Sequence, residues 1–182
     1  MKTLIKISFV LSLLIFASCE SENVKKDRLA QEEAERIEKE INDKYISNSL
    51  TSGSFPYAEY YGENSSCNEV GCSEIRITTS NSDVIVTIKK DNEVVQHAYI
   101  KAGDNYTFSL PNGTYQPFFY YGEGWNPEKE MKGGQMKGGF IANEVFSKDE
   151  PQSLYNNVLT YDLVLQQNGN FSTNPSNPEE AL

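Results

Sequence analysis

The chain has 182 residues with 26 acidic and 16 basic side chains, which gives a formal net charge of −10. This length suits one domain with short additional segments. The acidic balance argues against nucleic acid as a partner, because binding to phosphates requires clustered lysine and arginine.

The first twenty residues, MKTLIKISFVLSLLIFASCE, predict a secretory signal peptide over residues 1–18. Lys2 and Lys6 precede an apolar run that is too short for a permanent bilayer-spanning helix of about 20 residues. Phe16-Ala17-Ser18-Cys19 resembles a bacterial lipobox, which implies cleavage before Cys19 and a lipid on its sulfur. Ordinary signal cleavage with an unmodified Cys19 is the alternative.

Cleavage before Cys19 would leave 164 residues (182 less 18), with 14 basic against 26 acidic side chains and a net charge of −12. Several acyl chains on this cysteine would anchor the protein far better than the marginal binding given by one chain. The expected partner at this end is therefore a membrane, which the lipid on Cys19 reaches without a spanning segment.

Residues 19–46 predict an acidic lead followed by a helical stalk. The stretch from Val24 to Ile46 lacks glycine and proline and is rich in Glu, Lys, Ala and Arg, which favour helices. A solvated stalk is expected, with a helix docked on the domain or on a partner as the alternative. Residues 47–66 predict a linker and a cover for the domain. The apolar positions of the helix have a heptad spacing over fewer than two heptads, too few to establish a coiled coil: Ala30, Ala34, Ile37 and Ile41.

Cys67 and Cys72 are the two cysteines that remain if Cys19 carries a lipid. In an oxidising compartment such a pair predicts a disulfide, and Gly71 would ease the tight loop. A metal site is the rival interpretation, but two thiols without a nearby histidine do not complete a zinc shell. We expect neither a metal nor a cofactor.

From Ser73 onwards the hydrophobic period changes from helical to alternating. Asp91-Asn92 and Asn112-Gly113 suit tight hairpin turns, because Asn, Asp and Gly tolerate positive φ. The tandem repeat MKGGQMKGG is expected to form a flexible hairpin loop. Seven short strands are predicted: one from Ser73, then 83–90, 93–101, 106–110, 113–121, 138–146 and 157–166.

This strand pattern predicts a mainly β fold. We expect an antiparallel immunoglobulin-like or transthyretin-like sandwich of about seven strands over residues 67–167, preceded by one charged N-terminal helix. Residues 168–182 are polar and contain proline, so a disordered tail is predicted after the sandwich.

Several stretches carry a family resemblance. SDVIVTIKK, HAYIKAG, LPNGTYQPFFYYGEGWNP and LVLQQNGNFST together resemble an uncharacterised group of Bacteroidota lipoproteins, over most of residues 67–174. The acidic stretch Glu20-Ser21-Glu22 is similar to a signal for outer-membrane or surface delivery in that group. The resemblance implies a location at the outer membrane of a Gram-negative bacterium and a small β-sandwich domain. It implies no activity and no catalytic residues.

The side chains available for catalysis are few. His97 is the only histidine, and it lies in the middle of a predicted strand, where a packed side chain is expected rather than a general base. Two carboxylates can suffice for a glycosidase. The candidate pairs, Asp149 with Glu150 and Glu128 with Glu130, are interpreted as ordinary loop carboxylates of an acidic protein. We predict no catalytic residues and no enzymatic activity.

The stretch QPFFYYGEGWNP concentrates aromatic side chains. In a strand, Phe118 and Tyr120 would lie on the face opposite to Tyr121, so both faces would carry aromatic side chains. One face of a sandwich strand normally packs in the core and the other is exposed to solvent, so the aromatic side chains on the second face need an explanation. The favoured interpretation is burial beneath residues 55–61 or 131–139. An aromatic platform for a glycan or peptide, or a contact with lipid or a partner, is the alternative. The candidate ligand-binding residues are Phe118, Tyr120, Tyr121 and Trp125.

Taken together, these features predict a non-enzymatic lipid-anchored envelope lipoprotein whose β-sandwich serves as a binding or interaction module. Capture of a glycan or peptide on the aromatic stretch is one alternative. Inhibition of a basic enzyme such as a lysozyme or protease is another, suggested by the acidity and the small disulfide-linked domain.

Overall fold

The computed structural model describes residues 22–68, 71–165 and 173–182. The predicted signal peptide and Cys19 lie outside the described residues. The chain divides into two compact units, residues 1–38 and residues 39–182. None of the described helices combines the length and the apolar character that crossing a membrane requires.

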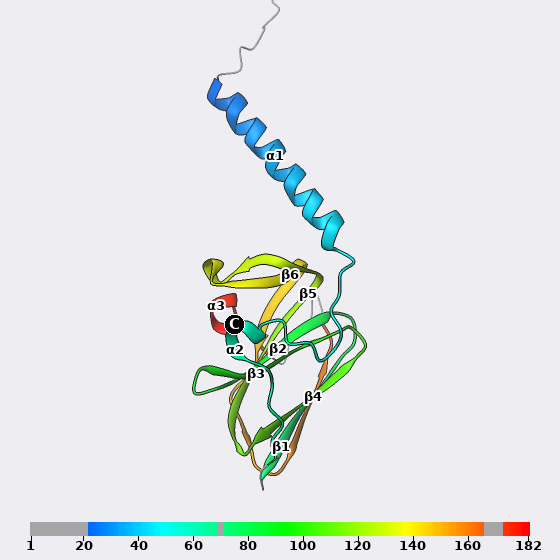
Figure 1. Cartoon of the computed structure of the whole chain (residues 1–182), viewed down its shortest axis with the longest axis vertical. Coiled ribbons are helices and arrows are strands. Elements are labelled where there is room, and N and C mark those ends of the chain that lie inside the picture. The colour runs from blue at the N-terminus through cyan, green and yellow to red at the C-terminus, as the bar shows by residue number, and fades with distance from the viewer. Residues whose placement is uncertain (1–21, 69–70, 166–172) are drawn as a thin grey trace, which may run out of the picture. The chain divides into compact units, whose positions relative to one another are not determined.

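The charged N-terminal helix is confirmed as α1, Glu22–Tyr45 (Figure 1). All of its residues before Tyr45 are exposed. Arg28 pairs with Glu32 at 2.7 Å and Arg36 with Glu33 at 2.5 Å, on the exposed surface of the helix. Pairs of this spacing stabilise an isolated helix by about 0.2 to 0.5 kcal/mol each.

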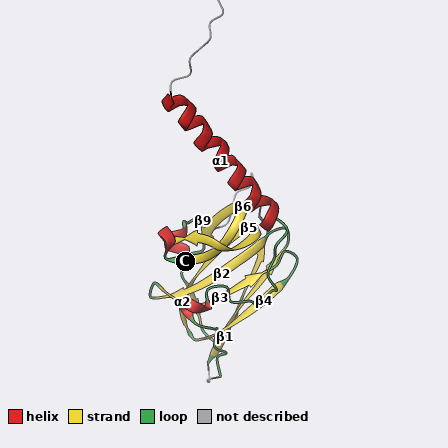
Figure 2. Ribbon diagram, turned by 45° about the horizontal axis from the view of Figure 1, so that its top comes forward, coloured by secondary structure: helices red, strands yellow, loops and turns green. Residues whose placement is uncertain are grey.

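The strands of the second unit form two sheets (Figures 1 and 2). The small sheet has the order β4-β1-β8, and the large sheet has the order β3-β2-β5-β6-β9, with β7 paired to the start of β5. The strands are β1 (Cys72–Thr79), β2 (Asp83–Lys90), β3 (Glu93–Ile100), β4 (Asn105–Pro111), β5 (Gly113–Met131), β6 (Met136–Lys148), β7 (Gln152–Leu154), β8 (Val158–Leu163) and β9 (Asn174–Pro175).

The inner faces of the two sheets enclose the inner cluster. β-branched residues on alternate positions of β1 and β2 point inward, as their period of two requires. Ile75, Ile77 and Val86 are fully buried there. Each such side chain contributes about 1.5 to 3 kcal/mol by leaving water. The buried members of the inner cluster are Ile75, Ile77, Val84, Val86, Ile88, Ala98, Ile100, Phe108, Leu110, Tyr115, Phe119, Tyr121, Leu154 and Leu163.

The mainly β sandwich is confirmed, with two differences from the predicted strands. All seven predicted strands are present, but the one expected over 113–121 continues to Met131, and the described residues add the short β7 and β9. The sheets are also not wholly antiparallel, because β8 runs parallel to β1. The chain reaches β8 from the β6–β7 side of the large sheet, so β8 joins the small sheet by crossing between sheets rather than through a hairpin.

The two predicted turns differ in outcome. Asp91 and Asn92 have φ values of 53° and 68° and join the antiparallel strands β2 and β3, as expected for a two-residue hairpin. The hairpin predicted at Asn112-Gly113 is wrong, because β4 and β5 belong to different sheets. The Asn112 side chain instead accepts hydrogen bonds from Ser73 Oγ at 2.9 Å and from the Asn156 N–H at 2.8 Å.

The repeat MKGGQMKGG forms the tip of the β5–β6 hairpin, which confirms the hairpin. A short 3-10 turn, η1 (Lys132–Gly134), connects the two strands. Met131 and Met136, one on each side of the turn, are 5% and 4% exposed. The tip is therefore tied to the core through its two methionines.

Residues 48–64 lie along β3 and the outer face of the large sheet. Gly53 donates its N–H to the Tyr99 carbonyl at 2.8 Å, and the Tyr99 N–H donates to the Ser54 carbonyl at 2.9 Å. The helix α2 (Ala58–Tyr61) follows, beginning after the fully buried Tyr57. This segment supplies the cover under which the outer aromatics of β5 lie.

The disorder predicted for residues 168–182 is wrong for the described part, 173–182. β9 pairs with β6, and α3 (Pro178–Ala181) follows it. The Asn177 side chain caps α3 by accepting the Glu180 N–H at 2.9 Å. Ala181 and Leu182 are 1% and 2% exposed. The burial of Ala181 and Leu182 against the outer face of the large sheet thus anchors this otherwise polar segment.

Candidate functional site

The aromatic stretch of β5 is buried on both faces of the large sheet. Phe119 and Tyr121 belong to the inner cluster. The other candidate residues lie on the opposite face: Phe118 is 3% exposed, Tyr120 1% and Trp125 5%. None of the four candidate ligand-binding residues forms an open platform in this structure, and Trp125 lines a pocket.

A second apolar core, the outer cluster, accounts for this burial. It lies between the outer face of the large sheet and two covering segments, residues 50–61 and the end of the chain. Tyr120 stacks on Phe146 with ring centroids 4.2 Å apart and an angle of 6° between the rings. The buried members are Tyr57, Ile85, Tyr99, Phe118, Tyr120, Trp125, Met131, Met136, Phe140, Ala181 and Leu182.

The buried hydroxyl of Tyr120, within the outer cluster, has two hydrogen-bond partners. The Tyr120 hydroxyl donates to Glu144, which also pairs with Lys129, and it accepts the Phe140 N–H at 2.8 Å. Burial, followed by the hydrogen bond to Glu144, raises the pKa of Tyr120. Tyr120 is thus a neutral core residue whose hydroxyl makes two hydrogen bonds.

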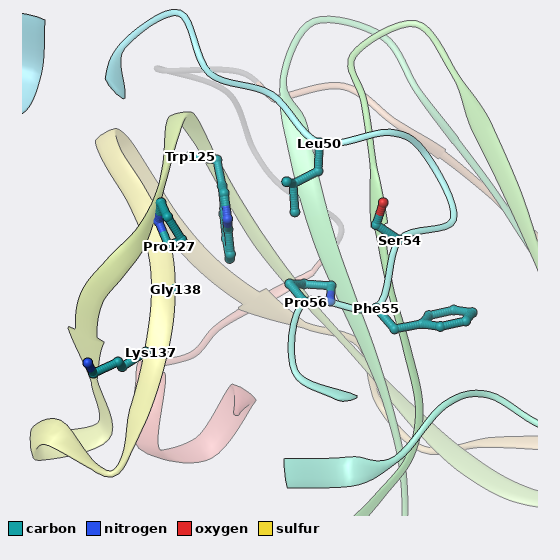
Figure 3. A pocket seen from close by; sticks show the side chains of 8 residues that line it. All are labelled: Leu50, Ser54, Phe55, Pro56, Trp125, Pro127, Lys137 and Gly138. Carbon is teal, nitrogen blue, oxygen red and sulfur yellow. The ribbon is translucent and has the colours of Figure 1, made fainter. Parts of the chain in front are cut away.

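A pocket of about 280 Å³ opens between the β5–β6 hairpin and residues 50–56. Figure 3 shows Trp125 and Pro127 on one side of it, Leu50 and Pro56 on the other, and the ring of Phe55 directed away from Trp125. Its remaining lining residues are Ser54, Lys137 and Gly138. The walls are therefore largely apolar, with an aromatic ring and two prolines.

Trp125 is held firmly in this pocket. The backbone N–H of Trp125 donates to the Asn48 carbonyl at 2.9 Å, and the backbone carbonyl of Trp125 accepts from Asn48 Nδ2 at 3.3 Å. Its ring packs edge-on against Tyr99 and Phe140. Among the described residues, the indole Nε1 has no hydrogen-bond partner. The pocket thus has a fixed aromatic ring in its wall.

Gly138 explains how the tryptophan fits. This glycine has φ of 102°, and a Cβ added to it would lie 2.6 Å from Trp125 Cζ2. The Tyr57 hydroxyl donates to its carbonyl at 2.9 Å. The GGF stretch therefore leaves room for the indole ring and ties the hairpin to the covering segment.

His97 is a structural residue of the cover. It is fully buried, and its Nε2 accepts the Tyr57 N–H at 3.1 Å. Its Nδ1 is buried and has no hydrogen-bond partner that meets the usual limits of distance and angle. The backbone of Phe55 stabilises the protonated imidazole and so acts to raise the pKa of His97. Burial dominates and lowers the pKa of His97 to about 4. The packed histidine expected from the sequence is present in this neutral, accepting role.

We expect His97 to make stability depend on pH. The unfolded chain, with a histidine pKa near 6.5, takes up a proton that the folded protein excludes until about pH 4. Stability is therefore fully present above pH 6.5 and is lost as the pH falls towards 4. Between about pH 7 and pH 5 the loss should be about 2 kcal/mol in the free energy of unfolding.

Urea unfolding at several pH values measures this effect. His97→Gln is the control, because its amide oxygen can accept the Tyr57 N–H without titrating. The carboxylates titrate in both proteins, so the difference between the two curves isolates the histidine. Parallel curves from pH 7 to pH 5 would show that the prediction is wrong.

The other predicted site residues have structural partners. Cys67 and Cys72 form a disulfide, with the two sulfurs 2.07 Å apart. The described residues contain no group of three or more His, Cys, Asp or Glu side chains placed to hold a metal ion.

Three of the four carboxylates considered for glycosidase chemistry have a partner as well. Asp149 accepts the Tyr161 hydroxyl at 2.6 Å, Glu150 accepts from Asn174 at 2.8 Å, and Glu128 pairs with Lys137 at 3.3 Å. These three carboxylates are engaged within the protein itself.

Sequence reasoning missed the pocket partners of Trp125 and the docked end of the chain. Leu50 and Pro56 come from a segment whose polar, Gly- and Ser-containing start suggested a linker. A signal for the second feature was present, since Asn177-Pro178-Glu179-Glu180 is a helix-start pattern. Comparison with known proteins returns no match, whether with family models, curated proteins or solved structures. The lipoprotein resemblance therefore stays a prediction.

Proposed function

We propose that this chain is a non-enzymatic, lipid-anchored lipoprotein of a Gram-negative outer membrane, and that its sandwich is a binding module with its ligand site at the Trp125 pocket. The anchor rests on the lipobox-like sequence before Cys19. The site rests on the pocket between Trp125, Pro127, Leu50 and Pro56.

The fixed ring of Trp125 in the pocket wall is the observation that carries this proposal. A fixed aromatic ring offers an apolar face at low entropic cost, and its N–H can donate to one oxygen of a ligand. Ligands that combine an apolar face with a nearby acceptor include pyranose sugars and prolyl peptides. Glycan or peptide capture is thus the ligand chemistry that the pocket supports.

The role assigned to His97 supports a binding module over an enzyme. The imidazole is buried, has a pKa of about 4 and uses Nε2 to hold the Tyr57 backbone. A general base needs access to substrate and a pKa near the working pH. This histidine contributes to the cover of the pocket and not to proton transfer.

Fluorescence of Trp125, the single tryptophan of the chain, tests the site. With 5% of the residue exposed, we expect a blue emission maximum and weak quenching by acrylamide. Neutral oligosaccharides and proline-containing peptides are then titrated. One of the two classes should shift the emission and reduce the quenching further.

Trp125→Phe provides the matched variant, because it keeps an aromatic ring and removes the N–H donor. Calorimetric titration should show at least ten-fold weaker binding of the ligand that shifted the emission, and circular dichroism below the thermal midpoint confirms that the variant is folded. If neither ligand class perturbs Trp125, or if Trp125→Phe binds equally well, this pocket is not the ligand site.

A further inference from the structure

Side chains from α2 and β2 hold the backbone of the last residues of the chain. Lys89 Nζ donates to the Glu180 carbonyl at 2.5 Å, and Thr87 Oγ1 donates to the Ala181 carbonyl at 2.6 Å. The Tyr61 hydroxyl donates to the Leu182 carbonyl. Three successive carbonyls thus each receive a side-chain donor, and two of these donors belong to one strand.

An acidic side chain is recognised beside these carbonyls. Lys148 of β6 pairs with the Glu180 carboxylate and lowers its pKa, and Ser176 Oγ donates to the same carboxylate at 3.1 Å. Burial lowers the pKa of Lys89, and the nearby charge of Lys132 lowers it further. Lys89 and Lys148 thus both lie near the Glu180 carboxylate, on a protein whose net charge is −10.

The apolar part of the same site takes Ala181 and Leu182, which are 1% and 2% exposed. Figure 1 shows α3 beside α2, in agreement with the hydrogen bond from Tyr61 to Leu182. We call the site formed by Tyr61, Thr87, Lys89 and Lys148 the tail groove. It contacts three kinds of group on the segment that occupies it: backbone carbonyls, one carboxylate and two small or apolar side chains.

We propose that the tail groove is a peptide-recognition site for an acidic partner peptide of Glu-small-Leu character, and that residues 176–182 are its resident ligand within the chain. Every contact described above is noncovalent and could be made equally by a separate peptide. Charge complementarity selects the partner, because the lysines favour a carboxylate at the position of Glu180. The resident segment competes at an effective concentration on the order of millimolar, so a partner must displace it.

The first experiment weakens the resident segment and leaves the groove unchanged. Glu180→Lys places a lysine beside Lys148 and Lys89 without altering the buried Ala181 and Leu182. Binding of a fluorescein-labelled peptide NPSNPEEAL, the sequence of residues 174–182, is followed by anisotropy. We expect the Glu180→Lys protein to bind this peptide at least ten-fold more tightly than the wild type.

Two matched variants make the test specific. Glu180→Lys combined with Lys148→Glu restores an opposite-charge pair within the chain, so peptide affinity should fall back to the wild-type level or below. Glu179→Lys makes the same charge change at the exposed neighbouring position and should bind like the wild type. A peptide of scrambled order should bind none of the proteins.

Circular dichroism confirms that each variant is folded, and Leu182→Ala, which shortens the buried anchor, is a second variant that should raise peptide affinity. Light scattering after size exclusion should show a monomer with and without peptide. The proposal is overturned if neither variant gains affinity for the peptide, or if the scrambled peptide binds as well. It is also overturned if Glu180→Lys dimerises without binding peptide, which would indicate exchange of the segment between copies. The Trp125 pocket is not involved in any of these measurements.

Discussion

Replacement of Tyr120 by alanine should lower the free energy of unfolding by about 3 to 5 kcal/mol, the range for truncation of a large buried aromatic residue. The ring is 1% exposed and stacks on Phe146. Its removal would also leave the buried Phe140 N–H without an acceptor and Glu144 without its hydroxyl donor. An unpaired buried donor adds about 1 to 3 kcal/mol to such a cost, and this contribution lies within the range given.

Denaturant unfolding of Tyr120→Ala beside Tyr155→Ala measures this effect. Tyr155 is 78% exposed and is the surface control, for which a change within about 0.5 kcal/mol is expected. Equal stability of both variants would mean that Tyr120 is exposed in solution and available as a ligand platform. The experiment therefore decides between core and platform for the outer face of β5.

Gly122→Ala should lower the free energy of unfolding by about 3 kcal/mol or more. The cause is not backbone strain, because the φ of this glycine lies outside the left-handed region. A Cβ added at Gly122 would lie 2.3 Å from Phe140 Cβ and 2.4 Å from its Cγ. The nearest atom belongs to the root of the Phe140 side chain, so no rotamer change can relieve the overlap. β5 and β6 would have to move apart where their register already shifts, between Tyr121 and Glu123.

The control for this variant is Gly103→Ala. Gly103 has φ of 82° and nothing within 4 Å of an added Cβ, so its replacement tests backbone strain without a collision. A cost of about 1 kcal/mol is expected there. Thermal unfolding should place Gly122→Ala well below Gly103→Ala. The reverse order would show that β5 and β6 are not packed as closely at Phe140 as the structure has them.

Local sequence predicts much of this fold, because strands and tight turns depend on neighbouring residues. The alternation in β1 and the β-branched run of β2 identify strands with an inward face. Asp91-Asn92 forms its hairpin because both residues accept positive φ and the strands beside them pair. Asn112-Gly113 offers the same local signal, yet β4 and β5 separate into different sheets. That outcome depends on long-range pairing with β1 and β2.

The candidate site was less accessible to sequence reasoning. The aromatic pattern shows that β5 is apolar on both faces, but it does not show what covers the second face. The cover consists of residues far apart along the chain, including Tyr57 and Leu182, each with weak local signals. Trp125 was identifiable as a candidate from its residue type and its place in the aromatic stretch. Its pocket arises only when Leu50 and Pro56 pack against the other side.

The backbone bonds between Tyr99 and residues 53–54 also bear on the behaviour of the protein at high concentration. β3 is the outermost strand of its sheet, and such a strand can recruit a strand from another molecule and start aggregation. Here Gly53 and Ser54 occupy both polar groups of Tyr99, while Asn64 accepts the N–H of His97 at 2.9 Å. These hydrogen bonds occupy backbone groups of β3 and thus hinder a second molecule from adding a strand at this edge. Unlike charge repulsion between molecules, this protection is not weakened by salt.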